Sequence, residues 1–291
     1  MRDFDYAAPA SVAEAVRLLN QSPGSGRPLA GGTDLIDQIR LGRHQPEVVI
    51  DIKRIPELNI LELSSRGLRL GSAVPCCRIY GDPGIAVDYA ALVDSARIIG
   101  GIQIQSRASV GGNLCNSGPA ADSIPSLIAL GARAVIAGLN GTREVAVEDF
   151  CTGPGKNVLQ RGEVLVELRF PPRAAQSGSH YRRFIPRNEM DIAVVSVGAS
   201  VELEANGDRI RGARIALGAV GPTPIFAREA SQLLIGKTPG PEAYDLAAKA
   251  AQAISSPIDD MRGTKEFRRH VAGVLVRRVL EECVQRARQR A

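Results

Sequence analysis

The sequence contains no tryptophan, 4% aromatic residues, three histidines and five cysteines in 291 residues. The cysteines, at positions 76, 77, 115, 151 and 283, form no C-x-x-C pair, which argues against a disulfide scaffold and against iron–sulfur ligation by this chain. With so few histidines, the sequence predicts no metal site. Aromatic residues for base stacking are also nearly absent from the arginine-rich stretch 277–290, so we expect no nucleic-acid binding.

Long apolar runs are absent as well: none approaches the roughly 18 residues that a membrane span needs. The N-terminus carries Asp3 and Asp5 and lacks the apolar segment of a secretory signal. We therefore expect a cytoplasmic protein without a membrane span. Hydrophobic residues make up 44% and charged residues 23%, which is typical of a globular chain with two or three packed units.

Helix and strand patterns alternate in the first 170 residues. Apolar periodicity predicts helices over 11–20, 35–41, 86–99 and 122–130, and strands over 27–30, 48–52 and 67–74. The stretches 132–137 and 145–147 flank Asn140-Gly141, which predicts a β-hairpin with a type I′ turn at that pair. This half of the chain is therefore an α+β mixture.

A proline-, glycine- and serine-rich segment over 171–179 has little to bury, which indicates a domain boundary. Beyond it, the pattern predicts strands over 192–203 and 210–220, joined at Asn206-Gly207, and helices over 242–254 and 264–287. We expect a C-terminal α+β domain with a small antiparallel sheet and helices.

Glycine pairs are the strongest candidates for a binding site. No G-x-G-x-x-G fingerprint opens a β-α-β unit, so an ordinary Rossmann site has no support. Gly31-Gly32 and Gly111-Gly112 instead each follow an apolar run, and two such glycine turns could aim backbone N–H groups at one pyrophosphate. The alternative, two tight turns without a ligand, stays open on physical grounds alone.

Two motifs carry a resemblance to a known family. The stretch Leu29-Ala-Gly-Gly-Thr-Asp-Leu35, together with Ala108-Ser-Val-Gly-Gly-Asn-Leu-Cys-Asn-Ser-Gly-Pro-Ala-Ala-Asp122, resembles the FAD-binding medium subunit of the molybdenum hydroxylases, the xanthine dehydrogenase and carbon monoxide dehydrogenase family. Asp191 to Val197 and Arg262 to Arg269 resemble that family's C-terminal flavoprotein domain. The resemblance implies a two-lobed FAD-binding domain of the vanillyl-alcohol-oxidase (PCMH) type over 1–176, with lobes of about 1–56 and 57–176, and a C-terminal domain over 177–291.

The resemblance also implies a set of cofactor contacts. Expected around the FAD are Leu29, Ala30, Gly31, Gly32, Thr33, Asp34, Leu35, Ile36, Ile99, Gly100, Ser109, Gly111, Gly112, Asn113, Ser117, Asp122, Leu165 and Arg183. Asp122 is equally compatible with a helix cap, and Leu165 with ordinary strand core. Arg183 stands where many relatives carry lysine and would stabilise negative charge on the reduced flavin. Gln105 replaces a frequent arginine, so one local hydrogen bond differs.

The function that follows from the resemblance is electron transfer. We expect FAD in this chain, [2Fe–2S] clusters in a small partner subunit and a molybdenum cofactor in a large one, assembled as a dimer of heterotrimers. The flavin would collect electrons and pass them to an acceptor such as NAD, oxygen or a quinone. The loop Arg187-Asn188-Glu189-Met190-Asp191 is expected to lie over the flavin and govern acceptor access. Two alternatives are a redox-inactive nucleotide-binding or assembly subunit and a stand-alone flavin oxidase.

Overall fold

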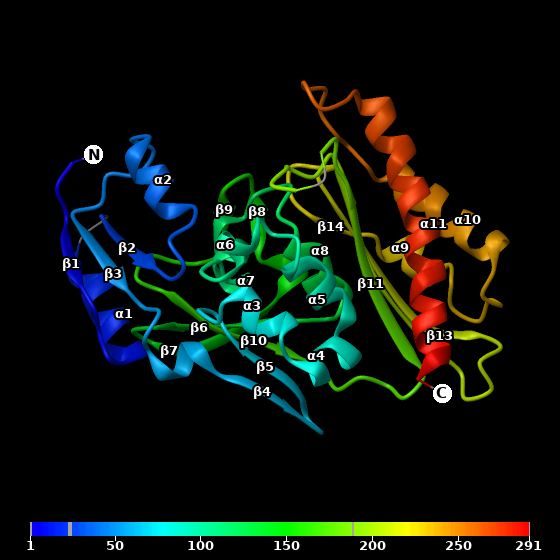
Figure 1. Cartoon of the computed structure of the whole chain (residues 1–291), viewed down its shortest axis with the longest axis horizontal. Helices are drawn as coiled ribbons and strands as arrows, with labels where there is room; N and C mark the ends of the chain where they lie inside the picture. Colours follow the sequence, from blue (N-terminus) through cyan, green and yellow to red (C-terminus); the bar gives the residue numbers. More distant parts are fainter. Residues whose placement is uncertain (1, 23–24, 188, 291) are drawn as a thin grey trace.

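A computed structural model describes residues 2–22, 25–187 and 189–290. Three regions follow one another along the longest axis of the molecule (Figure 1). Each region has its own cluster of buried hydrophobic residues. The chain therefore builds three neighbouring cores rather than one.

The N-terminal region is a small parallel sheet with helices. Its strands are β1 (Asp5–Ala7), β2 (Gly26–Leu29) and β3 (Val48–Asp51), in the order β1-β3-β2. Helix α1 (Val12–Gln21) connects β1 to β2, and α2 (Leu35–Arg40) connects β2 to β3. Ser11 accepts a hydrogen bond from the Glu14 N–H, and Glu14 Oε2 accepts one from Ala10 N–H, so a reciprocal cap starts α1.

The central region is a five-stranded antiparallel sheet in the order β4-β5-β10-β6-β7. Its strands are β4 (Leu61–Ser64), β5 (Gly67–Gly71), β6 (Arg133–Gly138), β7 (Gly141–Ala146) and β10 (Val164–Phe170). Six short helices lie between β5 and β6: α3 (Cys76–Tyr80), α4 (Pro83–Asp88), α5 (Ala90–Ala96), α6 (Ile102–Gln105), α7 (Val110–Asn116) and α8 (Ser123–Ala129). Two 3₁₀ turns, η1 (Pro56–Asn59) and η2 (Val147–Asp149), and the pair β8 (Cys151–Gly153) and β9 (Lys156–Asn157) complete it.

The C-terminal region is a four-stranded antiparallel sheet, β11-β12-β13-β14, covered on its outer face by helices (Figure 1). The strands are β11 (Ser177–Phe184), β12 (Val195–Leu203), β13 (Ile210–Gly218) and β14 (Ile225–Phe226). The helices are α9 (Arg228–Gln232), α10 (Pro241–Ala253) and the long α11 (Lys265–Gln289).

Helix α8 joins the central and C-terminal regions, because the C-terminal sheet packs directly on it. A Cβ atom at Gly198 of β12 would lie 2.7 Å from the Pro125 backbone, so only glycine allows this approach. Ser200 Oγ donates to the Ala129 carbonyl at 2.6 Å, and Arg214 Nε donates to the Ile128 carbonyl at 2.9 Å. All seven residues of α8 are buried.

Most predicted elements are confirmed, with two corrections to the helices. The helix predicted over 86–99 is two helices, α4 and α5, because Tyr89 leaves the helical region at φ −126°, ψ 49°. Gly111-Gly112, predicted as a turn, lies in the first turn of α7, because the Ser109 side chain caps that helix by accepting from Gly112 N–H at 3.0 Å. The sequence analysis also missed the strands β1, β4, β8, β9, β10, β11 and β14 and the helices α3 and α6.

The predicted hairpin is confirmed as β6–β7, but its turn is wrong by one residue. Gly138 pairs with Gly141, so the loop is Leu139-Asn140 rather than Asn140-Gly141. Only Gly141 has a positive φ, +106°, whereas a type I′ turn needs positive φ at both central residues.

Within the described ranges, no helix has the length and apolar composition needed to cross a membrane.

Candidate FAD site

The two glycine motifs lie against each other although about eighty residues separate them. A Cβ atom at Gly31 would lie 2.1 Å from the Arg107 carbonyl oxygen, so the chains touch backbone to backbone just before the second motif. Gln38 Nε2 of α2 donates to Asn116 Oδ1 of α7 at 2.9 Å. The predicted meeting of the two motifs is therefore present in the fold.

The first motif presents unpaired backbone donors. Gly32 has φ +79°, which turns the chain out of β2 and into α2. Among the described residues, the N–H groups of Gly31, Gly32, Thr33 and Asp34 donate to no protein acceptor, whereas Ile36 N–H bonds the Gly32 carbonyl at 3.1 Å. Consecutive free N–H groups in a turn form a concave donor surface for an anion. Such a surface fits a diphosphate.

The second motif is held rigidly around α7. A Cβ atom at Gly111 would lie 2.5 Å from the Ser72 carbonyl oxygen, so this helix sits directly on the end of β5. Asn113 Oδ1 accepts from Ser123 Oγ at 2.6 Å, which links the start of α7 to α8. As in the first motif, the N–H group of Gly111 donates to no acceptor in the described part of the chain.

Ser117 ends α7 in the left-handed region, at φ 51°. Its hydroxyl is fully buried, donates to the Leu114 carbonyl at 2.8 Å and lies 3.3 Å from Asn157 Nδ2. The side chain therefore maintains the shape of the loop in this structure, and a direct cofactor contact by Ser117 stays a prediction.

Asp122 lies at the start of α8 and accepts two hydrogen bonds from β11. Tyr181 Oη donates to Oδ1 and Arg183 Nη1 donates to Oδ2, both at 2.7 Å. The carboxylate makes no capping hydrogen bond to α8, so the helix-cap interpretation is wrong for its side chain. Burial raises the pKa of Asp122 to about 6, although Arg183 and Tyr181 act in the opposite direction. This group therefore changes charge near neutral pH.

Arg183 connects that carboxylate to the loop expected over the flavin. Its Nη1 atom also donates to the Asp191 carbonyl oxygen at 3.2 Å, and only 5% of its side chain is exposed. Although burial opposes it, hydrogen bonds from the N–H groups of Arg187 and Ile192 lower the pKa of Asp191. Gln103 Nε2 of α6 lies 3.7 Å from Met190 Sδ, which places this loop beside α6. Asn188 lies outside the described residues.

The remaining predicted residues surround this area or lie beneath it. Ile99 and Gly100 are partly buried between α5 and α6, with Gly100 at φ +59°. Leu165 of β10 is 3% exposed and belongs to the central core, so its contact with the cofactor stays a prediction. Gln105 Nε2 donates to the Arg97 carbonyl at 2.7 Å.

Sequence reasoning missed three residues that shape this site: Gln38, Asn116 and Tyr181. Tyr181 and Arg183 alternate on β11, so both side chains point to the same side of the sheet and reach Asp122. The alternation of Tyr181 and Arg183 could have identified Tyr181 from the sequence. It was missed because β11 was not predicted, since part of it lies in the segment interpreted as a domain boundary.

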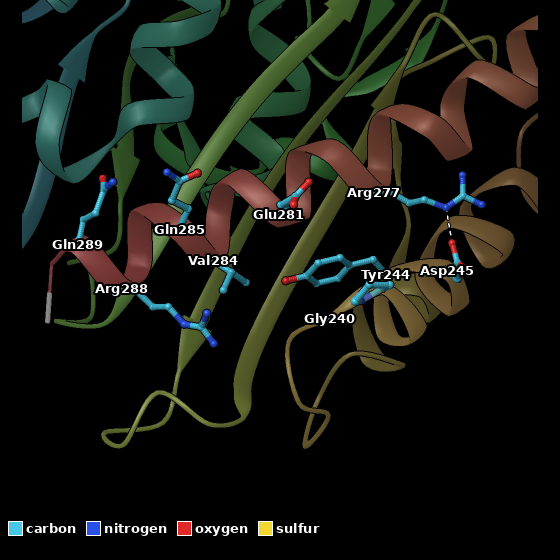
Figure 2. A pocket seen from close by; sticks show the side chains of 10 residues that line it. Gly240, Tyr244, Asp245, Arg277, Glu281, Val284, Gln285, Arg288 and Gln289 are labelled. Carbon is cyan, nitrogen blue, oxygen red and sulfur yellow. Dashed lines mark hydrogen bonds and ion pairs between the residues drawn. The ribbon is translucent and has the colours of Figure 1, made fainter.

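One cavity lies away from the two motifs. It has a volume of about 670 Å³ and opens between α10 and α11, where Tyr244, Asp245, Arg277 and Arg288 line it (Figure 2). None of the residues of the glycine motifs lines it. Its position on the outer helical layer separates it from the candidate cofactor site.

Comparisons with known proteins identify the family of this chain. Residues 2–173 match the FAD-binding domain in molybdopterin dehydrogenase, and residues 180–283 match the C-terminal domain of the carbon monoxide dehydrogenase flavoprotein. The carbon monoxide dehydrogenase medium chain of Hydrogenophaga pseudoflava is 34% identical over 95% of this chain and 96% of its own. The putative xanthine dehydrogenase FAD-binding subunit of Escherichia coli is 32% identical over 97% of each chain.

Solved structures show the same fold. A chain of carbon monoxide dehydrogenase from Hydrogenophaga pseudoflava superposes with a TM-score of 0.93 at 34% identity, covering 98% of both chains. A chain of quinoline 2-oxidoreductase from Pseudomonas putida gives a TM-score of 0.90 at 29% identity, covering 98% of both chains. The predicted fold class, an FAD-binding domain of this type followed by an α+β domain, is confirmed. The chain thus belongs to the family of FAD-binding subunits of the molybdenum hydroxylases, which are flavoprotein components of oxidoreductases.

Proposed function

We propose that this chain is the electron relay of a molybdenum hydroxylase complex. Electrons come from [2Fe–2S] clusters in a small subunit, after substrate oxidation at the molybdenum cofactor of a large subunit, and leave to an external acceptor. The observation that supports this role best is the pair of facing glycine motifs with free backbone donors. FAD, when bound there, supplies the exchange between two-electron and one-electron chemistry.

In this proposal, the residues of this chain bind and orient the FAD and do not transfer protons. The N–H groups of Gly31 to Asp34 and of Gly111 hold the two phosphates from opposite sides. The Gln38–Asn116 hydrogen bond fixes the separation of the two motifs. Leu29, Leu35, Ile36, Ile99 and Leu165 supply apolar contacts, and Asn113, Ser117 and Asp122 maintain the shape of the second loop.

Arg183 and Asp191 act as modulators in this proposal. The Arg183 guanidinium is fixed by Asp122 and by the Asp191 carbonyl, so its charge has a defined position beside the site. A fixed cation stabilises negative charge on the reduced cofactor. The Asp191 carboxylate contacts Arg187 and so joins the two ends of the loop from Arg187 to Asp191. We assign to this loop the control of acceptor access.

For the assembly, we propose a dimer of heterotrimers in the cytoplasm, with NAD, oxygen or a quinone as acceptor. The five free cysteines fit a reducing compartment. We place the domain boundary at residue 176, with lobes of about 1–56 and 57–176. The start of β11 at Ser177 supports that position.

The experiment is a visible absorption spectrum of the co-expressed complex, with the released cofactor identified after denaturation. Stoichiometric, non-covalent FAD, reduced when the complex receives electrons at its clusters, would support the relay. A complex without FAD would favour an assembly subunit. Full activity of the isolated chain with a substrate would favour a stand-alone flavin oxidase.

A further inference from the structure

The cavity between α10 and α11 contains no residue of the candidate cofactor site. The two helices pack antiparallel, because Asp245 pairs with Arg277 near the start of α10, whereas Gln252, near its end, donates to the Arg269 carbonyl. The C-terminal part of α11 therefore extends past the start of α10, and the cavity lies at that place (Figure 2). Its volume of about 670 Å³ falls within the range of about 300–1,000 Å³ that is usual for small-molecule sites.

Tyr244 presents an unpaired hydroxyl to this cavity. Only 8% of the residue is exposed, and its side chain belongs to the core of the C-terminal region. Among the described residues its Oη atom has no hydrogen-bond partner, whereas the hydroxyls of Tyr89 and Tyr181, the other buried tyrosines, both donate to protein oxygens. A buried tyrosine hydroxyl normally has a partner. Figure 2 shows this hydroxyl on the side of Val284 and Arg288, where a bound molecule would supply one.

One side of α11 lines the cavity with an apolar residue and an unpaired cation. Arg277, Glu281, Val284 and Arg288 all line it and recur at helical spacing, so they lie along the same side of the helix. Val284 is 4% exposed and supplies apolar surface. Arg277 is paired with Asp245, whereas Arg288 is exposed and forms no ion pair within the part of the chain that the structure describes. Arg288 is therefore available to an anion.

The start of α10 favours an anion as well. Gly240 and Pro241 line the cavity, and no side chain caps this helix of 13 residues. The N–H groups of Glu242 and Ala243 donate to no acceptor in the described ranges. Unpaired N–H groups and the helix dipole make this end positive. The Glu242 side chain is exposed and does not line the cavity.

The charges around the cavity favour one negative group over two. Arg277 and Asp245 neutralise each other, so Arg288 and Glu281 remain. Burial raises the pKa of Tyr244 to about 12, Arg288 acts in the opposite direction and Glu281 in the same one, so both charges act on the hydroxyl. Tyr244 is therefore a neutral donor at neutral pH. One carboxylate can accept from Arg288 and Tyr244, whereas Glu281 would repel a second carboxylate.

We propose that this cavity is a binding site for a small aromatic monocarboxylate. Its carboxylate accepts hydrogen bonds from the Arg288 guanidinium and the Tyr244 hydroxyl. Its ring lies against the Tyr244 ring and Val284, because aromatic rings pack favourably on aromatic and aliphatic side chains. The site lies outside the candidate FAD site, so its occupation does not depend on the proposed relay function. A neutral molecule and a second copy of this chain are the competing occupants.

The test is isothermal titration calorimetry of the co-expressed complex with 2-naphthoate as the probe. Arg288→Gln should raise the Kd about tenfold and Tyr244→Phe about fivefold, because the first loses a charge-assisted hydrogen bond and the second a neutral one. Arg288 is exposed and phenylalanine keeps the ring of Tyr244, so both variants should fold. Arg278→Gln is the matched control, because Arg278 is an exposed arginine of α11 that does not line the cavity.

Binding of 2-naphthoate elsewhere in the complex would be the same in all four proteins, so the component that the two cavity variants weaken identifies this site. The neutral 2-naphthamide and the doubly charged 2,6-naphthalenedicarboxylate should each bind there about fivefold more weakly than 2-naphthoate. No binding to the wild type, an unchanged Kd in both cavity variants, or equal affinity for the amide would overturn the proposal. A changed oligomeric state in Arg288→Gln with an unchanged Kd would also overturn it, in favour of a second copy of the chain.

Discussion

Gln38 and Asn116, 78 residues apart, join the two glycine motifs through one hydrogen bond of 2.9 Å between Nε2 and Oδ1. Among the described residues, no other side-chain hydrogen bond joins α2 to α7. The bond therefore sets how far apart the two sets of backbone donors stand. Cofactor retention should depend on it more than the stability of the fold does.

Gln38→Leu should weaken FAD binding by about fivefold, since one hydrogen bond contributes about 1 kcal/mol. The measurement is FAD fluorescence released from the complex on dilution. Gln21→Leu is the control, because Gln21 Oε1 accepts only from Arg17 within α1. Equal retention in both variants would show that the bridge does not position the motifs.

Gly31→Ala should abolish FAD binding and lower stability by about 1–3 kcal/mol, the range for overpacking. The new Cβ atom would lie 2.1 Å from the Arg107 carbonyl oxygen and push the motifs apart. Gly240→Ala is the control, because nothing lies within 4 Å of its Cβ position. Urea denaturation and FAD content measure the two effects, and a fully loaded, stable Gly31→Ala chain would refute the close approach.

Asp122 should make stability fall as pH rises from about 4 to 7. Burial raises its pKa in the folded chain from 3.8 to about 6, so the folded state binds the proton more tightly than the unfolded state. The stabilisation is then complete below pH 4 and is lost as pH rises through about 6. A shift of two pKa units corresponds to roughly 3 kcal/mol.

The check compares melting temperatures of the wild type and Asp122→Asn across this pH range. The stability of the wild type relative to the variant should decline with pH, because asparagine does not titrate. A difference that stays constant would mean that Arg183 keeps the carboxylate charged throughout.

Asp191→Asn should change which acceptor the complex prefers. The variant loses the ionic contact with Arg187, whose Nε lies 3.6 Å from Asp191 Oδ2, and so loosens the loop beside Gln103. We expect the ratio of kcat/KM for NAD to that for a quinone analogue to change at least threefold, about 0.65 kcal/mol. Glu189→Gln, an exposed change in the same loop, is the control. Unchanged preference and rate would remove the loop from acceptor control.

The sequence predicted the helices and strands well where a capping residue and a periodic pattern of apolar residues occur together. Ser11 with Glu14 fixed the start of α1, and Thr264, which accepts from Phe267 N–H at 3.2 Å, marks the start of α11. The same kind of signal at Ser109 was overlooked because two following glycines favour a turn. Whether a segment with both a capping residue and helix-breaking residues forms a helix or a turn depends on its packing. Here the contact of Gly111 with Ser72 decides it.

The site could be predicted only in part. Its motifs are short stretches of sequence, whereas the contacts that support them join residues far apart in the chain. The resemblance supplied both glycine motifs and Arg183. It did not supply Tyr181, whose partner Asp122 lies 59 residues away in sequence. Hydrogen bonds between distant segments depend on strand register, and the pattern of β11 alone does not reveal which helix its side chains reach.

The burial of α8 by β12 and β13 has a consequence for synthesis of the chain. Both glycine motifs are complete by residue 122, yet the sheet that covers α8 follows only after residue 176. At the usual translation rates of about 5–20 residues per second, the last 115 residues take roughly 6–23 seconds. During that interval the sheet that buries α8 in the folded protein is not yet present to cover it.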